Sequence, residues 1–162
     1  VLTDMPDHTG LQDHDVQTPE QVRQVVRTQI DLVLPEGVAV LNAEDPALVD
    51  MAHLCDGEVI YHAHDANHPT IVSHLAQQGR AVVRQQNQVL LLNGPHSQAL
   101  LDLDFPAIAK QLKDGVIHPD NLLAAVAVAW ALALSPDLIR AGLKNYGQPA
   151  AMANVDLSRI KT

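Results

Sequence analysis

Predicted helices alternate with short apolar strands along this sequence, and this alternation restricts the possible fold more than any other feature. Thr18-Pro19-Glu20-Gln21 combines a capping Thr, a Pro suited to the first helical position and a Gln that can bond back to the cap, which predicts a helix over 19–33. Pro35-Glu36-Gly37 ends that helix, and Val38-Ala39-Val40-Leu41 follows as a continuous apolar run. Such a run is typical of a strand covered on both faces. The opening therefore predicts an α/β unit.

The same pattern continues along the chain and predicts the fold class. We expect α/β architecture with a mixed sheet and helices on both faces, in one folded unit over residues 1–146, followed by a loosely structured tail over 147–162. The predicted helix over 121–134 is rich in Ala and apolar on nearly every face, so we expect it to be buried almost all round. The predicted elements are helices from Pro46 through Leu54, over 69–78, over 121–134 and from Pro136 to Tyr146, strands over 58–62, 80–84, 88–93 and 97–103, and a helical or irregular link after Pro106.

Charge and hydropathy exclude two classes of partner. With 10 basic against 19 acidic residues, the formal net charge of −9 opposes binding to nucleic-acid phosphates and to anionic membranes. The longest apolar run, Leu122 to Leu134, has 13 residues, whereas about 20 are needed to cross a bilayer. The single cysteine cannot form an internal disulfide, so we expect a cytoplasmic protein. A homo-oligomer stays possible.

Polar residues gather just after the first predicted strand end, over Thr3 to Gly10. His8 lies there among Asp4 and Asp7, and an imidazole with oxygen ligands could hold a hard cation such as the magnesium of a nucleotide. A solvated polar loop is the alternative.

Two further polar clusters lie at predicted element ends. Asn42 and Asp45 follow the strand 38–41 and could bind sugar hydroxyls or cap the next helix. Asn121 follows His118 at the start of the apolar helix, where its amide could read a base edge or act as an N-cap. The spacing alone leaves both roles open in each cluster.

The chain is rich in histidine, which raises the alternative of a zinc site. His62 and His64 are two residues apart on a predicted strand, so they face the same side and could share a zinc ion. We favour surface histidines at a polar strand end, because a structural zinc site usually has four good ligands. His14, His74 and His96 are also predicted to lie at the surface.

The order of the polar clusters resembles the latter half of the central, ATP-binding domain of the Mur ligase superfamily, in the form found in cyanophycin synthetases. The resemblance covers residues 1 to about 146. Thr3 to Gly10 resembles T-N-[IV]-x-x-D-H-x-[GD], Gly37 to Pro46 resembles G-x-x-V-L-N-x-D-D-P, His118 to Ala125 resembles H-N-x-x-N-x-x-A-A, and Ile139 to Leu143 resembles I-x-x-G-L.

This resemblance implies an activity and a set of site residues. Enzymes of that family bind ATP and magnesium, phosphorylate a carboxylate to an acyl phosphate and let an amine attack it to form an amide. By resemblance, His8 matches the metal-binding histidine, and Asn42, Asp45, His118 and Asn121 belong to the cofactor-binding segments, with Asn121 at the adenine-contacting position.

Departures from the family pattern keep a second function open. The phosphate loop G-x-x-x-x-G-K-[ST] of this P-loop NTPase-like fold does not occur in these residues, and the family carries it upstream of the position of Val1. We therefore expect a fragment that is not active alone. Asp4 and Pro119 replace family asparagines, and Val26 stands where the family has an often carbamylated lysine. The alternative is a non-catalytic Mur ligase-like domain retained for structure or oligomerisation.

Overall fold

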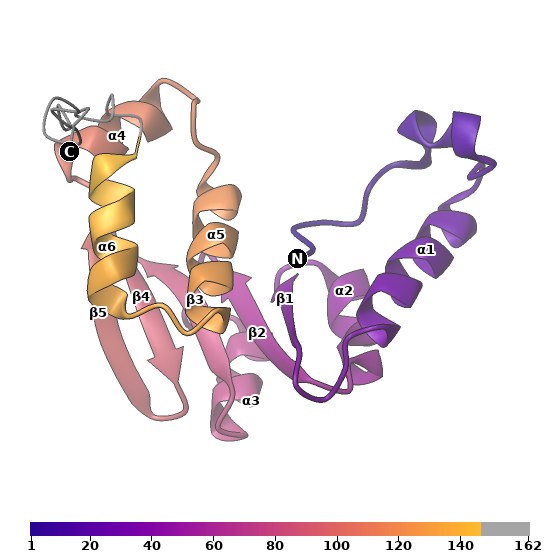
Figure 1. Ribbon diagram of the computed structural model, residues 1–162, viewed down its shortest axis with the longest axis horizontal. Coiled ribbons are helices and arrows are strands. Elements are labelled where there is room, and N and C mark those ends of the chain that lie inside the picture. The colour runs from indigo at the N-terminus through magenta and orange to yellow at the C-terminus, as the bar shows by residue number, and fades with distance from the viewer. Residues whose placement is uncertain (147–162) are drawn as a thin grey trace, which may run out of the picture.

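The computed structural model describes residues 1–146, and a mixed five-stranded sheet of order β1-β2-β3-β4-β5 lies at its centre. The first three strands are parallel, and the last two add to them antiparallel (Figure 1). The predicted tail, 147–162, lies outside the described residues. The strands are β1 (Val38–Asn42), β2 (Glu58–Ala63), β3 (Arg80–Gln85), β4 (Gln88–Asn93) and β5 (His96–Asp102).

Helices cover both faces of this sheet, which confirms the predicted fold class. Because successive strand residues point to opposite faces, Ala39 and Leu41 of β1 join one core while Val40 joins the other. The first core takes its helical residues from α1 (Pro19–Asp31), α2 (Pro46–Met51) and α3 (Pro69–Ala76), and the second takes them from α4 (Pro106–Lys113), α5 (Pro119–Ala131) and α6 (Pro136–Asn145).

Most helix starts follow the sequence signals closely, although α5 begins at Pro119 and not at the predicted residue 121. Each of the six α-helices among residues 1–146 begins at a proline, where the missing N–H costs no helical hydrogen bond. Thr18 forms the predicted capping box with Gln21, and Ser135 accepts a hydrogen bond from the Leu138 N–H. The second predicted helix is divided into α2 and a 3-10 turn, η3 (Ala52–Leu54).

The apolar helix α5 is shorter and less buried than expected. It ends at Ala131 instead of Leu134, because Ala133 adopts a left-handed conformation (φ 58°) that a helix cannot continue through. Leu132 is 70% exposed, and the side chains of Asn121 and Ala125 also face solvent. The prediction that this helix is buried almost all round was therefore wrong. Its buried residues are Leu122, Leu123, Ala124, Val126 and Ala127.

The N-terminal segment lies beside β1 at the edge of the sheet. Leu2 forms an isolated parallel bridge with Leu41, in which the Leu2 N–H donates to Val40 O (2.8 Å) and the Asn42 N–H donates to Leu2 O (3.1 Å). Two 3-10 turns, η1 (His8–Gly10) and η2 (Gln12–His14), then lead into α1. Within residues 1–146, every helix is too short or too polar to cross a bilayer.

Candidate functional site

The loops after β1 and β2 meet the first turn of α5 at one edge of the sheet, which we call the carboxyl edge. The backbone N–H of His64, just after β2, donates to Oε1 of Glu44, in the loop after β1 (3.1 Å). His64 Nε2 contacts Asp120 Oδ1, and Asp120 Oδ2 lies 3.3 Å from His118 Nδ1. Ligands of open α/β sheets bind beyond the carboxyl ends of parallel strands. The carboxyl edge is therefore the candidate site.

Asn42 and Asp45 attach the N-terminal segment to this edge. Asn42 Nδ2 donates to Thr3 O (2.8 Å), and Asn42 Oδ1 accepts from the Glu44 N–H (2.9 Å). Asp45 Oδ1 caps α2 by accepting from the Ala47 N–H (2.9 Å), while its Oδ2 accepts from the Met5 N–H (2.8 Å). The capping role of Asp45 is thus confirmed. A contact of either residue with a nucleotide stays a prediction.

His118, and not Asn121, is the N-cap of α5. His118 Nδ1 accepts from the Asp120 N–H (3.4 Å), which corrects the N-cap alternative for Asn121. Two residues separate His118 from Asn121, whereas the family pattern has three between its histidine and its second asparagine. Asn121 lies in the first turn of α5, with its side chain exposed.

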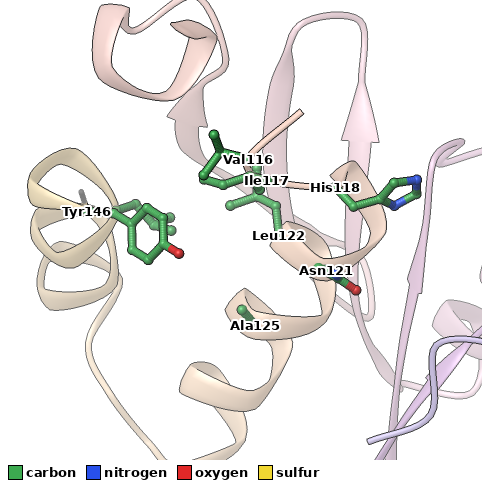
Figure 2. Close-up of a pocket in the computed structure, with 8 residues that line it drawn as sticks. Val116, Ile117, His118, Asn121, Leu122, Ala125 and Tyr146 are labelled. Carbon is green, nitrogen blue, oxygen red and sulfur yellow. The ribbon is translucent and has the colours of Figure 1, made fainter. Parts of the chain in front are cut away.

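A pocket of about 230 Å³ opens beside Asn121 (Figure 2). The ring of Tyr146, at the end of α6, lies across the pocket from α5, whereas the imidazole of His118 is directed away from Tyr146. The Asn121 amide is therefore a polar group beside a mostly apolar wall. The lining residues are Val116, Ile117, His118, Asn121, Leu122, Ala125, Leu143 and Tyr146.

His8 lies in η1, away from the contacts that join the carboxyl edge. Its Nδ1 is 3.0 Å from Asp7 Oδ1, and within residues 1–146 its ring forms no polar contact with Asn42, Asp45 or Asn121. Hydrogen bonds from the Thr9 hydroxyl and backbone N–H lower the pKa of Asp7, so its carboxylate is anionic. Magnesium is commonly held by one or two carboxylates together with water and substrate phosphates. Asp7 fits such a ligand set, whereas binding of magnesium by His8 stays a prediction.

His62 is the residue whose environment differs most from the sequence prediction. It is fully buried (0% exposed) on β2, and neither ring nitrogen has a hydrogen-bond partner within residues 1–146. Burial lowers the pKa of His62 to about 4, against the opposing effect of the Asp120 carboxylate. Its assignment as a surface histidine was wrong. Ile60, two residues earlier on the same strand, is also fully buried, and that period-2 relation was the available signal.

The other histidine predictions are partly confirmed. His14 and His96 are exposed. His74 is half-buried instead, with Nε2 3.1 Å from Val59 O and its ring packed edge-to-face on Tyr61 at 4.9 Å. Burial lowers the pKa of His74 despite that carbonyl contact. The surface assignment of His74 was therefore wrong.

Sequence comparison with known proteins relates this chain to one group of synthetases. The chain is 30% identical over 151 residues to the cyanophycin synthetase of Geminocystis herdmanii, covering 93% of the chain and 17% of that protein. It is 32% identical over 148 residues to the cyanophycin synthetase of Synechocystis, covering 90% of the chain and 16% of that protein. The chain is similar to one region of cyanophycin synthetases. No family model matches it.

The region shared with cyanophycin synthetases is a small part of each relative. A third relative, the cyanophycin synthetase of Crocosphaera subtropica, is 29% identical over 149 residues, and the chain again spans 16% of its length.

The structure also locates the departures from the family pattern. Val26 is 2% exposed in the core beneath α1, Pro119 is the first residue of α5, and Asp4 accepts a hydrogen bond from the Thr3 hydroxyl (2.8 Å).

Proposed function

We propose that this chain is the nucleotide-facing latter half of the central domain of a Mur ligase-type, ATP-dependent amide ligase. The observation that supports this most strongly is the similarity to cyanophycin synthetases at 30–32% identity over at least 90% of the chain. The positions of Asn42 and Asp45 just after β1, and of His118 and Asn121 at the start of α5, also support it, because ligands of such sheets bind beyond the carboxyl ends of parallel strands.

In the proposed reaction, a carboxylate oxygen of the substrate attacks the γ-phosphorus of ATP, forming an acyl phosphate and releasing ADP. The amine of the second substrate then forms the C–N bond, and inorganic phosphate leaves. Phosphoryl transfer depends mainly on positioning and on positive charge near the transferred group. Magnesium would supply that charge, with His8 and Asp7 among its ligands.

The chain's own residues would position the nucleotide. At about 230 Å³, the pocket beside Asn121 is smaller than the roughly 300–1,000 Å³ of typical small-molecule sites. It therefore suits one ring system and not a whole nucleotide, and the Asn121 amide offers both a donor and an acceptor to a base edge. Asn42 and Asp45 would fix the loop that carries His8, through their bonds to Thr3 and Met5.

One observation favours the alternative, a non-catalytic domain retained for structure or oligomerisation. Val26, which stands at the position of the family's carbamylated lysine, is buried in the core and offers no ligand atom. A second magnesium could not be held there by this chain. The alternative predicts that the whole protein has no ATP-dependent activity.

Amine-dependent release of ADP from ATP, measured in the whole protein that carries this chain, tests the proposal. We expect Asn121→Ala to raise the KM for ATP about tenfold with a smaller effect on kcat, because a hydrogen bond to a base is worth about 1 kcal/mol or slightly more. The matched control is Asn93→Ala, at an exposed position on β4. No ADP release by the intact protein, or equal effects of both substitutions, would contradict the proposal, and the first result would favour the non-catalytic alternative.

A further inference from the structure

Three potential metal ligands meet at the carboxyl edge without taking part in the proposed nucleotide contacts. They are a carboxylate oxygen of Glu44, Nε2 of His64 and a carboxylate oxygen of Asp120, and these atoms all lie within 4.8 Å of one another. We call them the Glu44–His64–Asp120 cluster. It is the one group of this kind in residues 1–146.

The fold places each member of the cluster at the end of a regular element. Glu44 follows β1, and its backbone N–H is held by Asn42 Oδ1 (2.9 Å). His64 follows β2, and Asp120 is in the first turn of α5. Glu44 Oε1 already accepts the His64 N–H, and His64 Nε2 already contacts Asp120. Because rigid elements carry these side chains, little ordering is needed to bring the three ligands together.

The charge of the cluster favours a cation. Two carboxylates and one imidazole lie together, and no Lys or Arg pairs with Glu44 or Asp120 within residues 1–146. His64 and Asp120 have side chains that are 35% and 29% exposed, so a cation from solvent can reach them. The basic side chains that contact these carboxylates are the imidazoles of His64 and His118, both on Asp120.

His62 gives an independent indication beside the cluster. It lies on β2, two residues before His64, it is fully buried, and neither ring nitrogen has a partner within hydrogen-bond geometry in residues 1–146. A buried polar group without a partner is costly, and a bound ion or water is one explanation for it. The charges of Asp120 and His64 both act on the His62 imidazole, which places this ring beside the cluster.

We propose that Glu44, His64 and Asp120 bind a divalent transition-metal cation, with Zn²⁺ as the representative ion. One imidazole and two carboxylates form a nitrogen and oxygen set that suits zinc, and three protein ligands leave a position open for water or a substrate atom. Ligand atoms around tetrahedral zinc lie about 3.3–3.6 Å apart, given bond lengths of about 2.0–2.2 Å. Zinc binding would therefore require His64 Nε2 and Asp120 Oδ1, now in direct contact, to separate and the exposed Glu44 carboxylate to adjust. This site requires neither His8 nor Asn121, and it does not depend on the proposed ligase reaction.

Calorimetric titration of the full 162-residue chain with Zn²⁺, in the presence of excess Mg²⁺, tests this proposal. We expect one equivalent of Zn²⁺ to bind, and each of Glu44→Gln, His64→Gln and Asp120→Asn to weaken the binding about tenfold or more. Zn²⁺ should also raise the Tm of the wild-type chain, because an ion that binds the folded state stabilises it, and this shift should be lost in His64→Gln. The matched controls are Glu36→Gln and His96→Gln, which replace an exposed carboxylate and an exposed imidazole elsewhere.

Several results would overturn the proposal. Absence of stoichiometric Zn²⁺ binding would do so directly. Equal weakening in the two control variants would show dispersed binding to surface side chains. If a cluster variant lowers the Tm of the metal-free chain but keeps full Zn²⁺ affinity, the cluster is only an internal ion pair. Displacement of Zn²⁺ by Mg²⁺ would also contradict a site that selects imidazole-binding cations.

Discussion

The two ends of the sheet, β1–β2 and β4–β5, are connected in different ways and carry different residues at their strand ends. Parallel β1 and β2 are joined through α2 and η3, so both strands run toward the carboxyl edge. Antiparallel β4 and β5 are joined by a short turn in which Gly94 has a positive φ of 51°. Within residues 1–146, the group of potential metal ligands lies at the parallel end.

This difference shows how topology concentrates polar groups. A parallel connection returns each strand in the same direction, so the loops after β1 and β2 open at one edge, and the first turn of α5 faces them there. A hairpin reverses direction at every strand and does not gather successive loops. In the antiparallel end, residues 96–99 of β5 are simply exposed. Substitutions at these exposed positions of β5 should therefore affect stability less than substitutions of buried residues of β2.

The largest expected difference is between Ile60→Ala in β2 and Ser97→Ala in β5. Ile60 is fully buried in the second core, so removing its side chain leaves a cavity and should lower the free energy of unfolding by about 2–5 kcal/mol. Ser97 is exposed, and its substitution should change that free energy by about 0.5 kcal/mol or less. Urea unfolding of both variants checks the contrast. If Ile60→Ala lowered the free energy of unfolding as little as Ser97→Ala does, the expected contrast would be contradicted.

A smaller effect is expected from the titration of His62. Its folded-state pKa of about 4 lies below the ordinary 6.5, so the unfolded chain binds more protons between these values and stability falls as the pH drops through that range. The difference of about 2.5 pKa units corresponds to about 3 kcal/mol, present above pH 6.5 and lost by pH 4. Because Leu does not titrate, His62→Leu should remove this loss of stability at low pH. His74, whose pKa is also lowered, leaves a slope of the same sign in both proteins.

Unfolding measured from pH 7.5 to 4 in a buffer with a chelator gives this comparison. His96→Leu is the control, because His96 is exposed on β5 and should keep the wild-type pH dependence. Identical pH profiles for His62→Leu and wild type would mean that His62 is readily protonated in the folded protein.

Local signals in the sequence were sufficient for most of the fold. Helix starts at Pro19, Pro46 and Pro136 and the hairpin of β3 and β4 were predicted because capping, Pro placement and apolar runs act over a few residues. The end of α5 was not, because the left-handed conformation of Ala133 has no Gly or Asn to indicate it.

The candidate site was predicted only in part, because its contacts are distant in sequence. Asn42 and Asp45 were identified from their position after a strand, and the structure adds their bonds to the N-terminal segment. Glu44, His64 and Asp120 were not grouped, since His64 is 20 residues from Glu44 and 56 from Asp120. The parallel pairing of β1 with β2 brings Glu44 and His64 together, the packing of α5 on the sheet adds Asp120, and no local pattern encodes either.

The smallest expected contrast compares two helix caps, Asp45 at α2 and Ser135 at α6. Asp45 accepts from the N–H groups of Ala47, Leu48 and Met5, whereas Ser135 accepts from the Leu138 N–H alone at 3.3 Å. Losing a cap costs about 0.5–2 kcal/mol, so we expect Asp45→Ala near the upper value and Ser135→Ala near the lower one.

The Met5 contact makes this comparison more specific than stability alone. Asp45→Ala removes the acceptor that holds the N-terminal segment against the carboxyl edge, so the Met5 amide should exchange its hydrogen faster, while in Ser135→Ala it should exchange as in wild type. Hydrogen exchange followed by NMR measures the exchange rate of the Met5 amide in each variant. If Asp45→Ala and Ser135→Ala were equally destabilising and Met5 exchanged alike in both, Asp45 would act as a helix cap only, and the attachment of the His8 loop to the parallel end would depend on Asn42 and the Leu2 bridge.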